Sequence, residues 1–458
     1  MHHDVVIIGT GSGNAVIDDT FSDLDVGLIE ERRAGGTCLN YGCIPSKMLV
    51  FSADVTDTVA TSGRFNVDAE SYGLRWTALR DRVFGVTNAR SDEGRKGRED
   101  SDNITFHQGH AEFTGPRQLR VTGEDGTSVD ITAGQIVIAN GGRPVIPPVV
   151  EESGLPFETS DTIMRIDAAP NRLAILGGGY IAAELAHVFA AAGSHVTIVE
   201  KSDRLLGGPQ DGELRDVFTA LRRQDYDLRL GTELSRLTGS PGALVLELDD
   251  GGTVEADVLL VASGRTPNSD RLNLDVSGVD VADDGRIVVD EFLRTTAEGV
   301  FALGDVCTPI PLKHVANREA EVVSHNLRHP DSLRAIDRER VPSAVFADPQ
   351  MASVGITEEV CREQHPDYLV GRTPYADVAY GWALQDDTGF CKVLVDRETR
   401  LVLGAHVMGP QAATLIQLFA VAMEFGIRAD DLAHRPFWIH PALTEVVENA
   451  LRDVEAAA

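Results

Sequence analysis

Residues 5–14 read VVIIGTGSGN, an apolar run that leads directly into a glycine-rich loop. Four branched apolar residues in a row predict a short buried strand. The glycines of the loop predict a turn whose backbone can approach a phosphate closely. A second strand over residues 26–29 ends at Glu30, 21 residues after Gly9. A strand, a glycine loop and a second strand that ends in an acid are typical of a dinucleotide-binding unit.

Two details of this first unit are also expectations. We expect a helix from the end of the loop to about Phe21, because a helix N-terminus offers free N–H groups and partial positive charge to a phosphate. Asn14 stands where a third glycine is usual. Asparagine tolerates unusual backbone angles, so we interpret Asn14 as a variant of the loop and not as its loss.

The same design recurs in the middle of the chain. Residues 173–176 form an apolar run, 177–182 read GGGYIA, and a helix is expected to about Ala192. The strand at 196–199 then ends at Glu200, 23 residues after Gly177. One such loop alone is as often a plain turn, but two loops, each with its acid, predict two nucleotide sites.

Similar segments at 136–144 and 258–265 bracket the second unit, as if the chain crosses between two domains there. The run at 299–305 returns to the first domain, and strands at 344–346, 392–395 and 403–407 precede C-terminal helices. The predicted class is α/β, with two Rossmann-like dinucleotide-binding domains and a C-terminal α+β domain. The predicted division of the chain is 1–145, 146–265, 266–340 (a return to the first domain) and 341–458.

Composition excludes several classes of protein. The chain has 458 residues, 43% of them hydrophobic, enough for about three domains with large cores. Lys and Arg number 41 against 71 Asp and Glu, a net charge of −30 that disfavours nucleic acid and anionic membranes as partners. Five cysteines and no signal-peptide pattern favour a reducing, cytoplasmic compartment.

Residues 35–47 read GGTCLNYGCIPSK and carry the chemistry. Cys38 and Cys43 are five positions apart, and Pro45 predicts a helix that begins near Cys43. A helix N-terminus there would favour a thiolate on Cys43. A zinc half-site and two unrelated buried thiols are the alternatives, but no second Cys/His pair has matching spacing, and we predict no metal. The segment therefore predicts a redox-active pair.

With these motifs in view, the chain resembles the pyridine nucleotide-disulfide oxidoreductases of the glutathione reductase and dihydrolipoamide dehydrogenase type, over essentially its whole length. The resemblance rests on the first loop, on residues 35–47, 177–184 and 300–305, and on His440-Pro441 with Glu445 five residues after the histidine. Within that family, residues 9–14, 376–382 and 438–451 most resemble the mycothione reductase branch.

The resemblance implies FAD and a nicotinamide nucleotide as cofactors. FAD would lie along the first unit, with Glu30 on the adenosine ribose and Asp305 on the ribityl chain. Lys47 and Glu184 would form an ion pair beside the flavin, and Tyr180 would cover the flavin until nicotinamide enters. The alternatives without a functional role are a Lys47 side chain in solvent and a Tyr180 ring that only packs against its neighbours. The cofactor-binding residues implied are Gly9, Gly11, Gly13, Glu30, Lys47, Gly141, Gly304 and Asp305, with Gly177, Gly179, Tyr180, Glu200, Lys201, Arg204, Gly264 and Arg265.

The resemblance also implies a reaction path and a homodimer. Hydride would pass from NAD(P)H to FAD, and the reduced flavin would open a Cys38–Cys43 disulfide. Cys38 would attack a small-molecule disulfide, and Cys43 would then displace the product thiol. His440, steadied by Glu445, would act as the acid and base from the other subunit. The plain alternative is a surface histidine.

The choice of nicotinamide nucleotide is not fixed by the motifs. Glu200 suits free ribose hydroxyls and repels a 2′-phosphate, which favours NADH. Lys201 and Arg204 follow at once and can bind that phosphate, and the mycothione reductase branch favours NADPH. We expect NADPH, with NADH as a second possibility.

Two other functions compete with this one. A dihydrolipoamide dehydrogenase, the E3 component of a large complex, shares the cysteine pair and an acid like Glu200, but the segment 438–451 argues against it. A flavin-bound redox sensor would not need so complete a catalytic set. The other three cysteines have no partner pattern and are expected to be inert: Cys307, Cys361 and Cys391.

Overall fold

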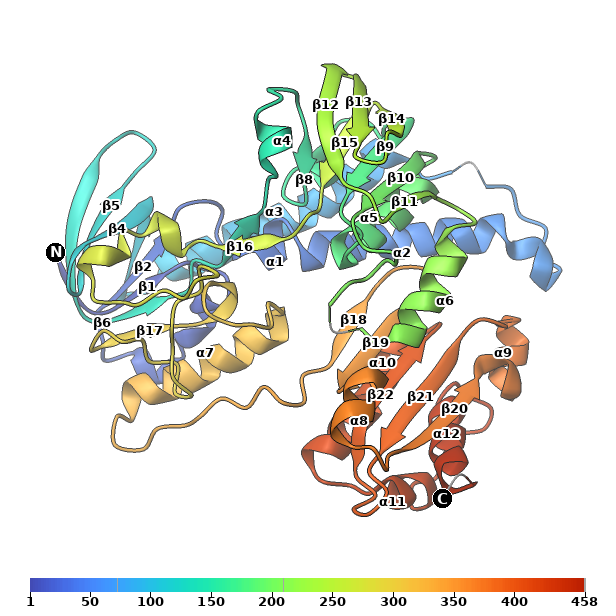
Figure 1. Cartoon of the computed structure of the whole chain (residues 1–458). Helices are drawn as coiled ribbons and strands as arrows, with labels where there is room; N and C mark the ends of the chain where they lie inside the picture. The colour runs from blue at the N-terminus through green and yellow to red at the C-terminus, as the bar shows by residue number, and fades with distance from the viewer. Residues whose placement is uncertain (72, 209, 457–458) are drawn as a thin grey trace.

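The computed structural model describes residues 1–71, 73–208 and 210–456, and it divides into three bodies (Figure 1). The first body is built on a seven-stranded sheet of order β3-β2-β1-β6-β5-β4, with β17 paired to β6. Its strands are β1 (His2–Ile8), β2 (Val26–Glu30), β3 (Ile104–Gln108), β4 (His110–Gly115), β5 (Gln118–Thr122), β6 (Ser128–Ile138) and β17 (Val300–Ala302).

The middle strands of this sheet are parallel, and their apolar runs are buried. β1 pairs in parallel with both β2 and β6, and the apolar run that opens the sequence lies between them, covered on both faces. β17 pairs in parallel with β6, so the chain does return to the first sheet after the middle of the sequence. The helices of this body are α1 (Gly36–Asn40), α2 (Cys43–Ala60), α3 (Trp76–Glu99) and α7 (Lys313–Arg328).

The helix expected after the first loop is wrong. Two short 3-10 turns, Gly13–Val16 and Asp19–Phe21, take its place, with Ile17 extended between them. The Asp18 side chain accepts a hydrogen bond from the Thr20 N–H and so caps the second turn. Two β-branched residues followed by Asp-Asp-Thr are poor helix formers, and an aspartate that bonds its own backbone competes with helix continuation.

The second body repeats the arrangement with a smaller sheet, of order β11-β10-β9-β15-β8. Its central strands β9, β10 and β15 are parallel, and α5 follows the second glycine loop as predicted. Its elements are α4 (Pro148–Glu151), β8 (Glu158–Thr159), β9 (Arg172–Leu176), α5 (Tyr180–Ala191), β10 (His195–Glu200), α6 (Gly212–Arg222), β11 (Asp227–Leu230) and β15 (Val258–Val261), with a separate three-stranded sheet of β12 (Leu234–Ser240), β13 (Ala243–Leu248) and β14 (Thr253–Ala256).

The two segments that bracket this body pair with each other. β7 (Gly142–Pro144) and β16 (Arg265–Pro267) form an antiparallel two-stranded ribbon, with Arg265 opposite Pro144. The segment by which the chain leaves the first body therefore lies next to the segment by which it returns. The exact residues at which the predicted domains divide stay a prediction.

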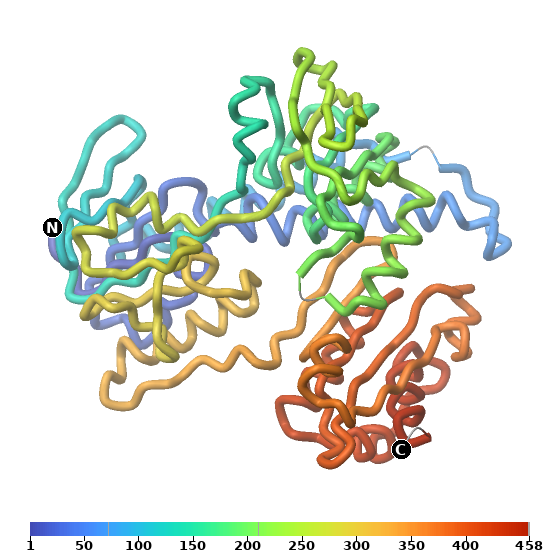
Figure 2. Tube along the Cα trace, viewed as in Figure 1, coloured from blue at the N-terminus to red at the C-terminus, as the bar shows by residue number. Residues whose placement is uncertain are grey.

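The third body is an α+β unit reached by a long connection after α7, the orange segment that crosses from left to right in Figure 2. Its antiparallel sheet has the order β18-β19-β22-β21-β20. Its elements are β18 (Ser343–Val345), β19 (Met351–Gly355), α8 (Glu358–Gln364), β20 (Leu369–Pro374), α9 (Ala379–Leu384), β21 (Phe390–Val395), β22 (Val402–Met408), α10 (Ala412–Glu424), α11 (Ala429–His434) and α12 (Glu445–Ala456). The predicted fold class, with its two parallel-sheet units and this third unit, is confirmed.

None of the helices in the described ranges combines the length and the apolar character that a bilayer crossing requires.

Candidate active site

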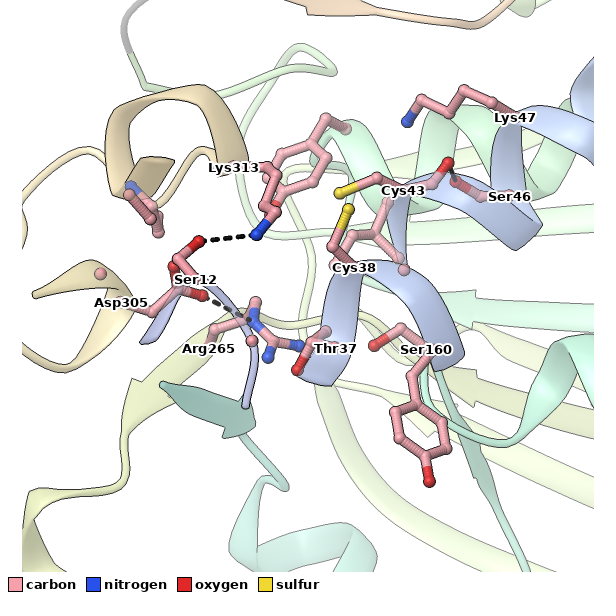
Figure 3. A pocket seen from close by; sticks show the side chains of 18 of the residues that line it. Ser12, Thr37, Cys38, Cys43, Ser46, Lys47, Ser160, Arg265, Asp305 and Lys313 are labelled. Carbon is pink, nitrogen blue, oxygen red and sulfur yellow. Dashed lines mark hydrogen bonds and ion pairs between the residues drawn. The ribbon is translucent and has the colours of Figure 1, made fainter. Parts of the chain in front are cut away.

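The two cysteines of the predicted redox pair lie together at the junction of two helices. Cys38 is in α1, and Cys43 is the first residue of α2, so both sulfurs face one cavity (Figure 3). The Cys38 thiol donates a hydrogen bond to the Cys43 sulfur, and both cysteines are free thiols in the structure. Two adjacent cysteines that open on a cavity can form and break a disulfide.

The surroundings separate the two thiols chemically. The hydrogen bond from Cys38, and then the positive charge of Lys47, lower the pKa of Cys43 to about 7. The same hydrogen bond, together with burial, raises the pKa of Cys38. The reduced pair therefore keeps its proton on Cys38 and carries its negative charge on Cys43, as the helix N-terminus at Cys43 suggested.

Lys47 and Glu184 form an ion pair next to the cysteines. The Lys47 ammonium lies 2.6 Å and 2.7 Å from the two carboxylate oxygens of Glu184. Glu184 lies on α5 of the second body and is buried, and one of its oxygens also accepts the Phe346 N–H at 3.1 Å. The pair thus joins α2 to α5, with a further bond from the third body, and it holds the Lys47 charge beside Cys43.

The opposite wall of the cavity comes from residues far along the chain. Gly304 and Asp305 follow β17, and Arg265 comes from β16. Burial raises the pKa of the Asp305 carboxyl, and the Arg265 Nε lies 3.9 Å from it. Tyr180 is the first residue of α5 and lines the same cavity with 44% of its surface exposed. An exposed aromatic ring over a cavity has room to move, which a ring that only packs does not.

Lys313 is a residue of this cavity that the sequence patterns did not single out. It is the first residue of α7, and its ammonium donates a hydrogen bond to the Ser12 hydroxyl at 2.8 Å. The only signals in the sequence are that lysine is rare in this chain and that Lys313 follows the GD motif of residues 304–305 closely. Neither signal predicts that the Lys313 side chain, at the start of α7, points toward the cysteines.

The first glycine loop opens a cavity that continues toward Glu30. This second cavity shares Gly11, Thr37, Tyr41 and Ala139 with the cysteine cavity, so the two run on from Cys43 to Glu30. The lining of this channel, with a glycine loop, an acid at one end and two thiols at the other, suits a dinucleotide.

Close packing keeps side chains out of this loop. A Cβ atom at Gly9 would meet the Ala139 carbonyl, one at Gly13 would lie 2.8 Å from the Ala139 Cβ, and one at Gly36 would lie 2.6 Å from the Gly11 Cα. The Asn14 side chain turns away and accepts a hydrogen bond from Arg98. The loop therefore needs no glycine at position 14, and its backbone stays accessible to a pyrophosphate.

Glu30 lies at the far end and organises the loop. One oxygen of its buried carboxylate accepts the Thr10 N–H at 3.0 Å and the Thr10 hydroxyl at 2.5 Å, and the other accepts the Arg32 N–H at 2.8 Å. The remaining lone pairs of the carboxylate suit ribose hydroxyls. The residues present therefore fit FAD.

The second glycine loop repeats this arrangement. Gly177 packs against Ala262 as Gly9 packs against Ala139. The Glu200 carboxylate accepts the Gly178 N–H at 2.6 Å and the Ser202 N–H at 2.8 Å. A Cβ atom at Gly179 would meet open space, so the start of α5 is accessible. Both loops are thus held by the acid at the end of the next strand.

The two basic residues that follow Glu200 differ in whether an acidic side chain pairs with them. Arg204 lies 3.0 Å from Asp216, while Lys201 is exposed and, in the described part of the chain, forms no ion pair. The two crossing segments contribute the remaining predicted glycines: Gly141 and Gly264, both with positive φ and both free of close contacts at the Cβ position.

His440 and Glu445 form a pair on the surface of the third body. The Nδ1 of His440 lies 2.8 Å from a Glu445 oxygen, and the ring is 72% exposed. That contact favours the tautomer with its proton on Nδ1, which leaves the Nε2 lone pair available as a base. His440 does not line the cysteine cavity of its own chain, as far as the described residues show.

The remaining cysteines lie apart from the site. Cys307, Cys361 and Cys391 are buried free thiols. Burial raises the pKa of each, which leaves them unreactive. Across 1–71, 73–208 and 210–456, the structure contains no group of three or more His, Cys, Asp or Glu side chains placed to hold a metal ion.

Comparison with known proteins gives two family models that match. One, described as pyridine nucleotide-disulphide oxidoreductase, matches residues 3–320, and its dimerisation domain matches 341–451. A mycothione reductase from Mycobacterium tuberculosis is 45% identical over 455 residues, covering 98% of this chain and 98% of the relative. A dihydrolipoyl dehydrogenase from Halobacterium salinarum is 34% identical over 455 residues, covering 98% and 95%.

The fold is also that of a solved reductase. An HOCl-induced flavoprotein disulfide reductase from Escherichia coli, solved as a Cu(II) complex, matches with a TM-score of 0.88 at 29% identity, over 99% of each chain.

Proposed function

The chain belongs to the pyridine nucleotide-disulphide oxidoreductase family, and from that premise we propose that it reduces mycothione, the disulfide of mycothiol, with electrons from NADPH. The observation that carries the proposal is the Cys38–Cys43 pair, which lies beside the ion pair of Lys47 with the buried Glu184 at one end of a channel that suits a dinucleotide. The identity of 45% to a mycothione reductase over almost the whole chain supports this substrate.

Bound FAD would carry two electrons from the nicotinamide to the Cys38–Cys43 disulfide. The chain would hold it by the backbone of the first loop, by Glu30 at one end and by Asp305 and Lys47 at the other. Tyr180 would cover the nicotinamide side of the cavity. All of these residues line the channel.

The thiol steps follow from the different surroundings of the two sulfurs. Opening the disulfide takes two electrons and one proton, and leaves a thiol on Cys38 and a thiolate on Cys43. Cys38 must lose its proton to attack the substrate disulfide, which forms a mixed disulfide and releases one mycothiol. The Cys43 thiolate then attacks Cys38, restores the disulfide and releases the second mycothiol.

Cys38 therefore needs a base, because its surroundings hold the proton on it. We propose that His440 of the other subunit of a homodimer supplies that base, and later protonates the leaving thiol. Its Nε2 is exposed, and Glu445 fixes the ring. Phe437 and Ile439, which stand close to His440 in the sequence, are also exposed, as an interface requires.

NADPH is the nicotinamide nucleotide that we propose. Lys201 is exposed beside the second loop and forms no ion pair among the described residues, and Arg204 follows it closely in the sequence. The Glu200 carboxylate is already bonded by two backbone N–H groups, which reduces its repulsion of a phosphate. We also propose a cytoplasmic enzyme, because a reducing compartment keeps the other thiols of the chain reduced.

The test is a comparison of substrates. Purified protein with FAD would be assayed for NADPH oxidation with mycothione, glutathione disulfide and lipoamide, each over a range of concentrations. A value of kcat/KM highest for mycothione supports the proposal. Rapid flavin reduction by dihydrolipoamide, with NADH as product and no turnover of mycothione, would establish dihydrolipoamide dehydrogenase instead.

A further inference from the structure

Lys313 places a half-buried ammonium in the cysteine cavity, with no carboxylate partner among the described residues. Its Nζ donates to the Ser12 hydroxyl at 2.8 Å, and that hydroxyl donates to the Asn317 side-chain oxygen at 3.3 Å. Within the residues that the structure describes, Lys313 forms no ion pair. Figure 3 shows its side chain on the wall that faces Cys38 and Cys43.

The other lysine of the cavity is different. Lys47 lies 2.6 Å and 2.7 Å from the oxygens of Glu184, so its charge is balanced within its own pair. Arg265 and Asp305 oppose each other at 3.9 Å. Among the residues that line the cavity, Lys47 is therefore balanced by Glu184 and Arg265 by Asp305, and Tyr180 is neutral. Lys313 is the lining cation that remains without a balancing carboxylate.

Partial burial of an unpaired ammonium is costly, and it lowers the pKa of Lys313. Proteins retain such an unfavourable cation at sites where an anion forms close to it. The groups that counteract this lowering are the cysteine pair, whose negative charge lies on Cys43, and Asp305. Asp305 already faces Arg265, and Lys47 shares its charge with Glu184, so the thiolate is the anion that Lys313 can balance.

We propose that Lys313 supplies the positive charge that stabilises the thiolate of the reduced Cys38–Cys43 pair. The proposal rests on the redox pair of the proposed function. The reduction adds two electrons and one proton to the disulfide, and the one net negative charge that remains sits on sulfur opposite Lys313. The ammonium acts across the cavity and touches neither sulfur in the structure, so Lys313 is a positioning residue for charge and not a catalytic one.

The experiment measures the thiolate directly. In a Cys38→Ser background, the FAD-loaded protein has one thiol at the site, and a long-wavelength thiolate–flavin absorbance reports the charge on Cys43. This absorbance would be titrated with pH in Lys313→Met and Lys313→Arg proteins. Lys96→Met is the matched control, because it removes one exposed lysine charge on α3.

Loss of the facing charge should move the midpoint of the Lys313→Met titration up by about one pH unit, so that about tenfold less thiolate is present below the midpoint. Lys313→Arg keeps the charge and should titrate like the parent, as should Lys96→Met. An unchanged midpoint in Lys313→Met, or an arginine variant shifted as far as the methionine variant, overturns the proposal.

A second measurement covers loss of flavin. If Lys313→Met does not retain FAD, the pH dependence of Cys43 alkylation by iodoacetamide in the apoproteins gives the same comparison, with the same outcomes. Neither measurement needs substrate turnover. A protein that fails to reduce mycothione but shows the shift contradicts the proposed function alone, and one that reduces mycothione without the shift contradicts the role of Lys313 alone.

Discussion

Cys38 and Cys43 are chemically alike in the sequence, and their neighbours give them different tasks. A hydrogen bond from one thiol to the other fixes which sulfur keeps the proton, and Lys47 reinforces the choice. The thiolate sits at the first residue of a helix, where the helix dipole also favours negative charge. At the scale of single residues, the site is therefore an arrangement of charge around two sulfurs.

The first prediction follows from this arrangement. The two-electron-reduced, FAD-loaded protein should show a long-wavelength thiolate–flavin band, since the pKa of Cys43 is lowered to about 7. The band should fade as the pH falls below that value, because protonation removes the thiolate. Cys43→Ser should lose the band, and Cys38→Ser should keep it, because Cys43 is then a free thiolate that cannot form a disulfide with residue 38. Absorbance spectra over a pH series measure both. Retention of the band in Cys43→Ser would contradict the assignment.

A second prediction at this scale concerns the nicotinamide nucleotide. Replacing Lys201 and Arg204 with alanine should raise the KM for NADPH and leave that for NADH nearly unchanged. Hydrogen bonds to a charged phosphate contribute roughly 1.5–3 kcal/mol each, or about tenfold or more per residue. Lys201 should contribute more, because Arg204 is engaged by Asp216.

The control for this prediction is Glu200→Ala. If the Glu200 carboxylate determines the nucleotide preference, the wild-type protein prefers NADH. Glu200→Ala then weakens the binding of NADH and strengthens the binding of NADPH. Steady-state kinetics with both nucleotides distinguish the two cases, and a wild-type preference for NADH above about tenfold, more than about 1.4 kcal/mol, would refute the choice of NADPH.

At the scale of elements, each glycine loop is held between the end of its own strand and the end of a neighbouring strand. Gly9 packs on the end of β6, Gly177 on the end of β15, and each loop is bonded by an acid at the end of the following strand. This arrangement does not need an α-helix after the first loop, since two 3-10 turns replace it. The start of α1 packs against that loop through Gly36.

A third prediction tests this contact. Gly36 has a φ of +63°, and a Cβ there would lie 2.6 Å from the Gly11 Cα. Gly36→Ala should therefore displace the loop and lower the FAD content of the purified protein severalfold. Gly94→Ala is the matched control, because Gly94 lies in the middle of α3 with open space at its Cβ. The ratio of flavin to protein absorbance measures the effect, and full flavin content in Gly36→Ala would contradict it.

At the scale of the whole molecule, a buried cluster of charges joins the second and third bodies. Lys392 of β21 lies 2.8 Å from Asp211, 3.2 Å from Glu213 and 2.6 Å from Glu358. Asp211 and Glu213 are at the start of α6, whereas Glu358 is on α8. The side chain of Lys392 is only 2% exposed, so its three carboxylate partners satisfy its charge.

The fourth prediction follows from this cluster. Lys392→Met would leave the buried Asp211 carboxylate without its lysine, at a cost of about 3–5 kcal/mol. We expect a clearly lower urea midpoint for unfolding of the variant. Arg90→Met is the control: it breaks an ion pair with Glu93 whose side chains are 70% and 65% exposed, and should change stability by less than about 1 kcal/mol. Equal midpoints for the two variants would show that the cluster does not stabilise the junction.

The fifth prediction concerns two copies of the chain. Cys38→Ser and His440→Ala proteins should each be inactive. After subunit exchange, half the dimers are mixed, and each mixed dimer has one site with both changes and one with neither. The mixture should therefore recover about a quarter of wild-type activity. Activity measured before and after exchange, with exchange shown by mass-tagged subunits, tests this. No recovery despite proven exchange would place His440 in the site of its own chain.

The sequence by itself determined the features that depend on neighbours along the chain. The strand–loop–strand units with Glu30 and Glu200, the cysteine pair and the helix that begins at Cys43 are each set by a short run of residues, because turn geometry and hydrophobic alternation are local. Only the tertiary structure decided how residues from distant runs meet. It placed Lys313 opposite the cysteines with no ion-pair partner among the described residues, and it buried Lys392 of the third body beside Asp211 and Glu213 of the second. The physical reason is that the electrostatic environment of a side chain depends on its burial and on the packing of whole sheets and helices. Neither the burial nor the packing can be read from the periodicity of the sequence.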